Sequence, residues 1–212
     1  MLMVKEYDTS SYLHSPHPND HYTNMNVELI LVSSDTQRDI AKHIIEKYHS
    51  YVPTYKSVGR RIDYLVYYDS EVVGVIGIGS ATYPPCKDVL RYMGISKEQY
   101  KDIFNTIGNN WRFCLSKGIK NLGSTTLKLF REYAKRDWKL KYGDDLRWIV
   151  TFVGGGHDGA VYKADNWVAI GKTAGLPKHK SVSMKWDDSD SIAKKFVKPD
   201  GKDKKIIYIK RL

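Results

Sequence analysis

The spacing of apolar and polar positions along this chain predicts its helices and strands. Some stretches have apolar residues three to four positions apart, as in a helix, and others are short apolar runs typical of strands. Residues 26–32 have the composition of a strand, and apolar residues three to four apart predict a helix over 36–48. Two β-branched and aromatic runs, 62–67 and 72–78, predict a hairpin. Both runs are almost continuously apolar, which favours a central place in a sheet.

The second half of the chain alternates the two periods. Helices are predicted over 96–107, 127–134 and 159–165, and strands over 111–115, 146–153, 167–170 and 204–209. This order predicts a mixed α/β domain. Glycines 74, 77 and 79 interrupt a predicted strand, which indicates a bulge or a close approach by a ligand or another backbone.

Composition divides the chain into three parts. Residues 1–24 are polar and predict a flexible N-terminal arm, although His14, His17 and His21 have a spacing that also suits a metal. Residues 25–186 form the predicted domain. Residues 187–212 are a basic segment whose last strand is expected to complete the sheet.

Charge narrows the class of partner. The net charge of +10 over 212 residues favours DNA, while a lysine-rich surface that only confers solubility is the alternative. No apolar run approaches the roughly 20 residues that span a bilayer, so no membrane partner is expected. Two cysteines without zinc spacing, and a start too soon charged for a signal peptide, predict a cytoplasmic protein.

One turn has the pattern of an anion site. It joins the strand predicted over 111–115 to the helix predicted over 127–134, where backbone N–H groups and the helix dipole favour a phosphate. Gly123 can take positive φ and admit a ligand. An ordinary loop with a Ser or Thr helix cap is the alternative. The predicted cofactor-binding residues are Lys120, Asn121, Leu122, Gly123, Ser124 and Thr125.

The order of elements and this turn resemble the GNAT acyltransferases. In that family an Arg/Gln-x-x-Gly-x-Gly/Ala turn holds the pyrophosphate of coenzyme A. Here Lys120 replaces Arg or Gln, and Thr125 replaces the last small residue and narrows the turn. The resemblance implies a GNAT-like α/β fold, with a mixed sheet covered by helices on both faces. It also implies acetyl-coenzyme A, or a related phosphate-bearing donor, as cofactor.

Further segments resemble a narrower group, the phage Mom-like DNA-modification proteins and the Druantia component A family. The matching segments, within residues 45–186, are 58–65, 74–80, 109–113, 121–124, 151–152, 159–167 and 171–175. For the Mom branch the resemblance implies transfer of a carbamoylmethyl group to the exocyclic amine of adenine, which protects phage DNA from restriction. The Druantia branch implies a role in defence against phages.

The resemblance also implies catalytic residues. Ser124 matches the serine that opens the helix, and Tyr162 matches a tyrosine able to act as a general acid, since a phenol ordinarily has a pKa near 10. A core tyrosine with one hydrogen bond is the alternative. His49 lies near the position of a His-Tyr pair in a proposed iron site. The pair is not reproduced, and Asp158 stands a few residues late for the family aspartate, so the iron ligands are incomplete and no metal site is predicted.

Two more groups of residues are candidates. His157 and Asp158, beside three glycines, suit a general base on a loop or a solvent-exposed turn. Phosphate contacts to nucleic acid are predicted for basic residues, with a bland surface role as the alternative. These residues are Arg60, Arg61, Arg112, Lys163, Lys178 and Lys180.

The leading hypothesis is a GNAT-like transferase that modifies a DNA base. The base would be taken single-stranded or flipped out, because its amine is hard to reach inside a duplex. Two alternatives stay open. One is an acyl-coenzyme A-dependent N-acyltransferase acting on a small amine or a protein, and the other is a non-catalytic DNA-binding component of a phage or anti-phage system.

Overall fold

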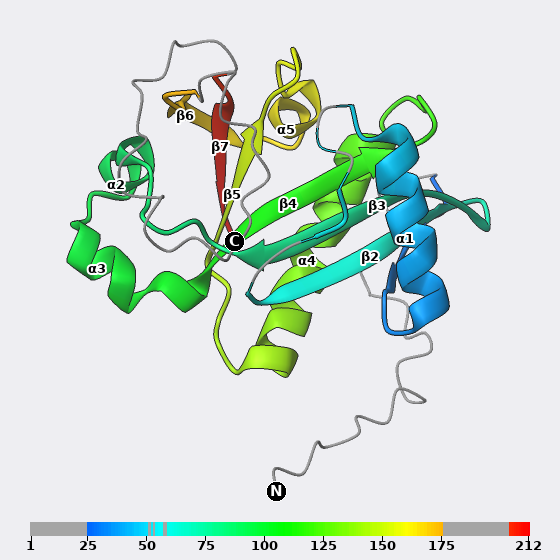
Figure 1. Cartoon of the computed structure of the whole chain (residues 1–212), viewed down its shortest axis with the longest axis horizontal. Helices are drawn as coiled ribbons and strands as arrows, with labels where there is room; N and C mark the ends of the chain where they lie inside the picture. The colour runs from blue at the N-terminus through cyan, green and yellow to red at the C-terminus, as the bar shows by residue number, and fades with distance from the viewer. Residues whose placement is uncertain (1–24, 51, 53, 57–58, 176–203) are drawn as a thin grey trace, which may run out of the picture.

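One mixed sheet carries the fold. The computed structural model describes residues 25–50, 52, 54–56, 59–175 and 204–212. Within these residues seven strands lie in the order β1-β2-β3-β4-β5-β7-β6 (Figure 1). The strands are β1 (Val27–Leu31), β2 (Arg61–Tyr68), β3 (Glu71–Ser80), β4 (Ile107–Leu115), β5 (Trp148–Val153), β6 (Val168–Lys172) and β7 (Ile206–Arg211). The helices are α1 (Asp35–Tyr48), α2 (Lys87–Met93), α3 (Lys97–Asp102), α4 (Leu122–Tyr142) and α5 (Ala160–Ala164), with a 3-10 turn η3 (Phe104–Thr106).

Helices cover both faces of the sheet, which confirms the predicted fold class. The alternation of side chains along β2 puts Tyr64 on one face and Leu65 on the other. Tyr64 packs with Phe130 of α4, and Leu65 packs with Ile45 of α1. Figure 1 shows α1 in front of the sheet and α4 behind it.

Helix α4 is longer than the sequence pattern predicts. The helix was predicted over 127–134, yet it begins at Leu122 and continues to Tyr142. The reason is that one face stays apolar through these turns, where Trp138 is fully buried. The helix predicted over 96–107 was also too long, because α3 ends at Asp102 and β4 begins at Ile107.

Strands β4 and β5 separate after a short parallel pairing. Ile107–Asn109 pair with Trp148–Val150, and no further pairs join the two described strands. Beyond Asn109 the free edges of β4 and β5 diverge, while β5 pairs with β7 along its other edge (Figure 1). Between β3 and β4 the register shifts at Gly77/Ile78, which leaves Trp111 as an extra residue. The bulge predicted from the strand glycines is confirmed at Gly77.

The last strand lies inside the sheet. β7 pairs antiparallel with β5 on one side and with β6 on the other.

The predicted arm over 1–24, and with it the three histidines considered as metal ligands, lies outside the described residues, as do Lys178 and Lys180. Among the described helices, none is both long and apolar enough to span a bilayer.

Candidate functional site

The gap between the diverging strands is a cleft with a volume of about 390 Å³. Its walls come from the end of α1, from β4 beyond Asn109, from the end of β5 and from the segment that leads into α5. Pockets for small molecules in proteins usually measure about 300 to 1,000 Å³. The cleft therefore has room for a ligand of the size of a nucleotide.

Tyr162 and Asn110 meet in this cleft. The Tyr162 hydroxyl donates a hydrogen bond of 2.7 Å to Asn110 Oδ1. The Asn110 amide donates to the carbonyls of Gly77 and Arg112, at 2.8 and 3.0 Å. Thr151 Oγ1 donates to the Asn110 carbonyl at 3.1 Å, just where β4 leaves β5. Tyr162 is thus a buried tyrosine, as the alternative expected, and it also lines the cleft.

Histidines and cations gather at the same cleft. Burial, together with the nearby charges of Arg112, His157 and Lys205, lowers the pKa of His49 to about 4. His49 is therefore neutral at pH 7. Its Nδ1 accepts the N–H of Val52 at 3.3 Å, so the ring proton is on Nε2. His49 was predicted as a catalytic residue, and the structure gives it the properties of a hydrogen-bond donor rather than a base.

Arg112 ties the segment after α1 to β4. Its Nε and Nη2 donate to the Thr54 carbonyl at 3.2 and 3.0 Å, and its Nη1 donates to the Trp111 carbonyl at 2.7 Å. Across the cleft, Ser50 Oγ and His157 Nε2 lie 2.8 Å apart. Arg112 was predicted to contact nucleic acid, and here several of its donors hold the protein's own backbone.

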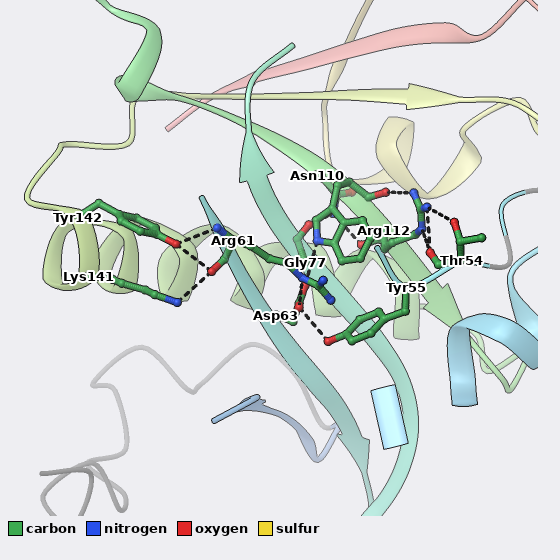
Figure 2. A network of polar contacts seen from close by, with 10 residues as sticks. Thr54, Tyr55, Arg61, Asp63, Gly77, Asn110, Arg112, Lys141 and Tyr142 are labelled. Atoms are coloured by element: carbon green, nitrogen blue, oxygen red, sulfur yellow. Dashed lines mark hydrogen bonds and ion pairs between the residues drawn. The ribbon is translucent and has the colours of Figure 1, made fainter. Parts of the chain in front are cut away.

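Arg61, also predicted as a phosphate contact, lies in a network of polar contacts (Figure 2). Its guanidinium carbon lies 3.9 Å from the Tyr55 ring centroid and 4.1 Å from that of Trp111. Asp63 accepts hydrogen bonds from Arg61 at 2.5 Å, from Tyr55 at 2.8 Å and from Trp111 at 2.9 Å. The chain needs glycine at 77, because a Cβ there would lie 2.2 Å from Asp63 Oδ1. The Arg61 guanidinium is therefore committed to internal contacts, which disfavours the predicted role.

The remaining described candidates are also paired. Arg60 bonds Asp144 at 2.5 Å and lies over the Tyr142 ring, with its guanidinium carbon 4.8 Å from the centroid. Lys163 pairs with Asp158 at 2.9 Å on the surface. The hydrogen bond from Lys163 and, to a smaller extent, the one from the N–H of Ala160 hold the pKa of Asp158 below its usual range. The Asp158 carboxylate thus accepts from Lys163 and from the N–H of Ala160, which argues against its predicted role as a base.

The predicted phosphate turn differs from expectation in its backbone. Positive φ falls on Asn121, at +63°, and not on Gly123. Residues 122–125 form the first turn of α4, where Leu122 and Thr125 are buried and Ser124 Oγ donates to the Asn121 carbonyl at 3.1 Å. Lys120 precedes this turn on the surface.

Gly123 is required for packing between helices. A Cβ at this position would lie 2.5 Å from Val161 Cγ2 of α5. Val161 lines the cleft, but none of residues 120–125 does. The turn and the cleft are thus separate features of the described structure. The residues present do not fit the pyrophosphate of coenzyme A at the place that the resemblance implied, and we derive no step through that cofactor.

A resident metal finds no support in the described part of the chain. No group of three or more His, Cys, Asp or Glu side chains there is placed to hold a metal ion. His49 lies near Arg112 and Lys205, whose charges lower its pKa and disfavour a second cation. The described residues do not fit the iron site of the Mom-like proteins.

Sequence reasoning missed Asn110 and Asp165. Asn110 lies just before the strand predicted over 111–115, yet it directly follows the β4–β5 pairing and holds Tyr162. Asp165 accepts two hydrogen bonds from Arg131, at 2.9 and 2.8 Å, and one from Trp167 at 2.8 Å. The motif Asp165-Asn166-Trp167 is therefore structural. It fixes α5 beside the cleft.

Comparison with known families decides the assignment. The family model Druantia protein DruA matches residues 4–202, almost the whole chain. The chain belongs to the Druantia DruA family. This confirms the predicted relationship to the Druantia proteins, while the resemblance to the Mom branch stays a prediction. No curated protein matches this DruA-family chain in sequence.

Solved structures show the fold of this DruA-family chain. FeeM, an N-acyl amino acid synthase from uncultured soil microbes, matches with a TM-score of 0.51 and 10% identity, covering 89% of this chain and 91% of FeeM. The aminoglycoside acetyltransferase AAC(6′)-Ib in complex with coenzyme A matches with a TM-score of 0.51 and 11% identity, covering 87% and 94%. The same acetyltransferase with paromomycin and acetyl-coenzyme A gives 0.52 and 10%, covering 87% and 93%. The GNAT-like fold is confirmed. At these identities the matches show the fold alone.

Proposed function

We propose that this DruA-family protein takes a nucleotide of DNA into the cleft between β4 and β5 and transfers an acyl or carbamoylmethyl group to an amine of its base. The amine attacks the carbon of an activated donor, so the N–C bond forms as the bond to the donor's leaving group breaks, and the amine loses its proton to water. One observation carries the proposal. A cleft of about 390 Å³ brings the Tyr162–Asn110 pair together with Arg112, His49 and His157. A cleft with basic walls suits a nucleotide, which combines a flat polar base with a negative phosphate.

Size and charge support DNA as the substrate. The net charge of +10 attracts a polyanion over long range. Enzymes that modify a base extrude it from the stack or use single strands, since the reacting amine is otherwise out of reach. Phe113 and Phe152 line the cleft and offer aromatic surface to an extruded base.

The polar groups of the cleft have separate tasks in this proposal. The Tyr162 oxygen donates to Asn110 at the cleft, and in this proposal it accepts from an amine of the base when a nucleotide binds. His49 lines the same cleft and is neutral at pH 7, which suits contact with a base. These contacts orient the amine toward an incoming group, and orientation is a major part of transfer catalysis.

The test is the mass of the nucleosides. DNA from phage-infected bacteria that express the full chain is digested to nucleosides and analysed by mass spectrometry. We expect a new nucleoside whose added mass identifies the transferred group, in the wild type and in Tyr208→Phe. We expect no such nucleoside in Tyr162→Phe. Unmodified DNA from cells that express a folded wild type would overturn the transferase proposal.

One observation favours a second function, a non-catalytic DNA-binding component of a defence system. Asp158 is ion-paired and the pKa of His49 is lowered to about 4, so neither has the properties of a poised base. A base-stacking probe such as 2-aminopurine separates the two functions. Fluorescence that rises on binding, with no modified nucleoside, would support the binding role.

A third function, N-acylation from acetyl-coenzyme A, is disfavoured by the contact between Gly123 and Val161. Calorimetry with acetyl-coenzyme A tests it, and we expect no binding heat.

A further inference from the structure

The outer face of α4 is strongly basic. Helix α4 lies behind the sheet and buries its apolar side against it, so this face points away from the sheet (Figure 1). Residues three, four, seven or eight apart lie on the same side of a helix. On the outer side of α4 one acidic residue, Glu132, accompanies five basic residues, which are Lys128, Arg131, Lys135, Arg136 and Lys139.

This bias is specific to α4. Helix α1, on the opposite face of the sheet, carries three acidic and three basic residues. On α4, Lys135 lies four residues from Arg131 and four from Lys139. Like charges at this spacing repel one another and destabilise a helix. The basic face therefore costs the helix some stability, and an anionic partner would turn this repulsion into attraction.

Two of these basic residues keep their charge uncompensated. Among the residues that the structure describes, Lys128 and Lys135 are exposed and make no ion pair. They lie about two helical turns apart on the same side. The other three have carboxylate partners, in the pairs Arg131–Asp165, Arg136–Asp137 and Lys139–Asp145.

We infer that the outer face of α4 binds the phosphate backbone of double-stranded DNA. The inference rests on the proposed function, which names DNA as the partner, and it assigns the surface that holds the duplex beside the nucleotide taken into the cleft. Charge complementarity decides the occupant. A duplex carries one negative charge for about every 1.7 Å of its axis, and a row of exposed lysines and arginines neutralises several of these phosphates together.

Arg131 connects the basic face to the cleft. Its guanidinium donates two hydrogen bonds, of 2.9 and 2.8 Å, to Asp165 at the end of α5. Lys210 of β7 donates to the Asp165 carbonyl at 2.8 Å, so a second cation lies at the same place. Helix α5 lines the cleft through Val161 and Tyr162. Because α5 contacts both features, a duplex held along α4 would lie next to the nucleotide site.

Binding of a duplex tests this face apart from base modification. A fluorescein-labelled DNA duplex of about 20 base pairs is titrated with the full chain, and anisotropy is followed at salt concentrations between about 50 and 200 mM. We expect Lys128→Gln/Lys135→Gln to weaken binding at least about tenfold. The slope of log affinity against log salt should also become shallower by about 2, since each lost phosphate contact removes about 0.9.

A matched variant assigns the effect to α4. Arg38→Gln/Lys42→Gln removes the same charge from α1, on the other face of the sheet. We expect this control to stay within about threefold of the wild-type affinity, because net charge acts only weakly at long range in salt. Urea unfolding should show that Lys128→Gln/Lys135→Gln is at least as stable as the wild type, because the substitutions relieve like-charge repulsion.

Three outcomes would overturn the inference. They are no duplex binding by the wild type, an equal affinity loss in the two double variants, and displacement of the labelled duplex by poly-L-glutamate as readily as by unlabelled DNA at equal charge. The last result would show a site for any polyanion. Duplex binding through α4 by a chain that leaves DNA unmodified would retain this surface and reject the transferase. Modified nucleosides together with an unchanged duplex affinity in Lys128→Gln/Lys135→Gln would do the reverse.

Discussion

The Tyr162 hydroxyl donates a 2.7 Å hydrogen bond to Asn110 Oδ1 at the point where β4 separates from β5. This pair joins α5 to β4 across the floor of the cleft. The Tyr162 ring is stacked on Tyr208, with centroids 5.7 Å apart, and meets Trp167 edge to face at 5.1 Å. Packing therefore fixes the tyrosine from the sides, and the hydrogen bond fixes its oxygen.

Replacing Tyr162 with Phe tests this oxygen. The variant keeps the ring packing but leaves Asn110 Oδ1 buried without its partner, so we expect a loss of about 1–3 kcal/mol in the free energy of unfolding. Urea denaturation measures it. Tyr208→Phe is the matched control, since its hydroxyl donates to the Asp158 carbonyl and does not line the cleft. Only Tyr162→Phe is expected to abolish base modification, and loss of product in both variants would point to a general packing defect.

Gly123→Ala tests whether this glycine is required by packing. The new Cβ would meet Val161 Cγ2, and the β-branched valine cannot turn away freely. We expect the variant to lose about 1–2 kcal/mol of stability, because overpacking outweighs the better helix propensity of alanine. Thermal or urea unfolding measures the loss.

Val161→Ala, alone and combined with Gly123→Ala, completes a double-mutant cycle. With the valine shortened, Gly123→Ala is expected to become neutral or stabilising by up to about 1 kcal/mol. A glycine needed for a ligand would behave differently, since its substitution would weaken ligand binding in both backgrounds. An equal loss of stability with and without Val161 would contradict the packing account.

The fold was predictable because local patterns decide it. Runs of β-branched and aromatic residues predicted the central hairpin, and Ser34 with Gln37 forms the capping box that starts α1. The length of α4 was not predictable from charge, since the lysines and arginines of residues 135–142 hide an apolar stripe that ends at Trp138 and Tyr142. This apolar face of α4 becomes clear only once β2 is known to pack against it.

The site was harder to predict than the fold, because distant segments build it. Tyr162 was found from its motif, yet its partner Asn110 was not, because the role of Asn110 depends on where β4 and β5 diverge. Arg60 and Arg61 looked like surface cations, since no local pattern reveals a carboxylate such as Asp63 two residues along and facing the same network. Electrostatic neighbours in space, such as His49 and Lys205, leave no spacing signal at all.

The Asp63 network predicts coupled effects on stability. Asp63→Asn removes the charge that pairs with a guanidinium held between Tyr55 and Trp111, and we expect a loss of about 2–4 kcal/mol. The double variant Asp63→Asn/Arg61→Met should recover part of this stability, because it removes the buried guanidinium that Asp63→Asn leaves without its carboxylate. Urea unfolding of the two single variants and the double variant measures the coupling. Strictly additive losses would show that the ion pair between Arg61 and Asp63 does not cause the loss of stability in Asp63→Asn.

The low pKa of His49 predicts a specific response to acid. The folded chain resists protonation of His49 until about pH 4, whereas the unfolded chain takes up the proton near the ordinary pKa of 6.5. The unfolded state therefore binds more protons between these values, and stability falls as the pH drops from 6.5 to 4. Above 6.5 this group has no effect. We expect the wild type to lose about 1–2 kcal/mol more than His49→Asn over that range, after allowance for solvent around the ring.

Lys205→Gln tests whether the charge of Lys205 contributes to the low pKa of His49. Removing this cation eases protonation of His49 and raises its pKa, so the acid-induced loss relative to the matching His49→Asn double variant should shrink. Unfolding free energies at pH 7 and pH 4 for the four chains give the comparison. The same loss with and without Lys205 would mean that burial alone sets the pKa of His49, and that the two side chains do not share one electrostatic site.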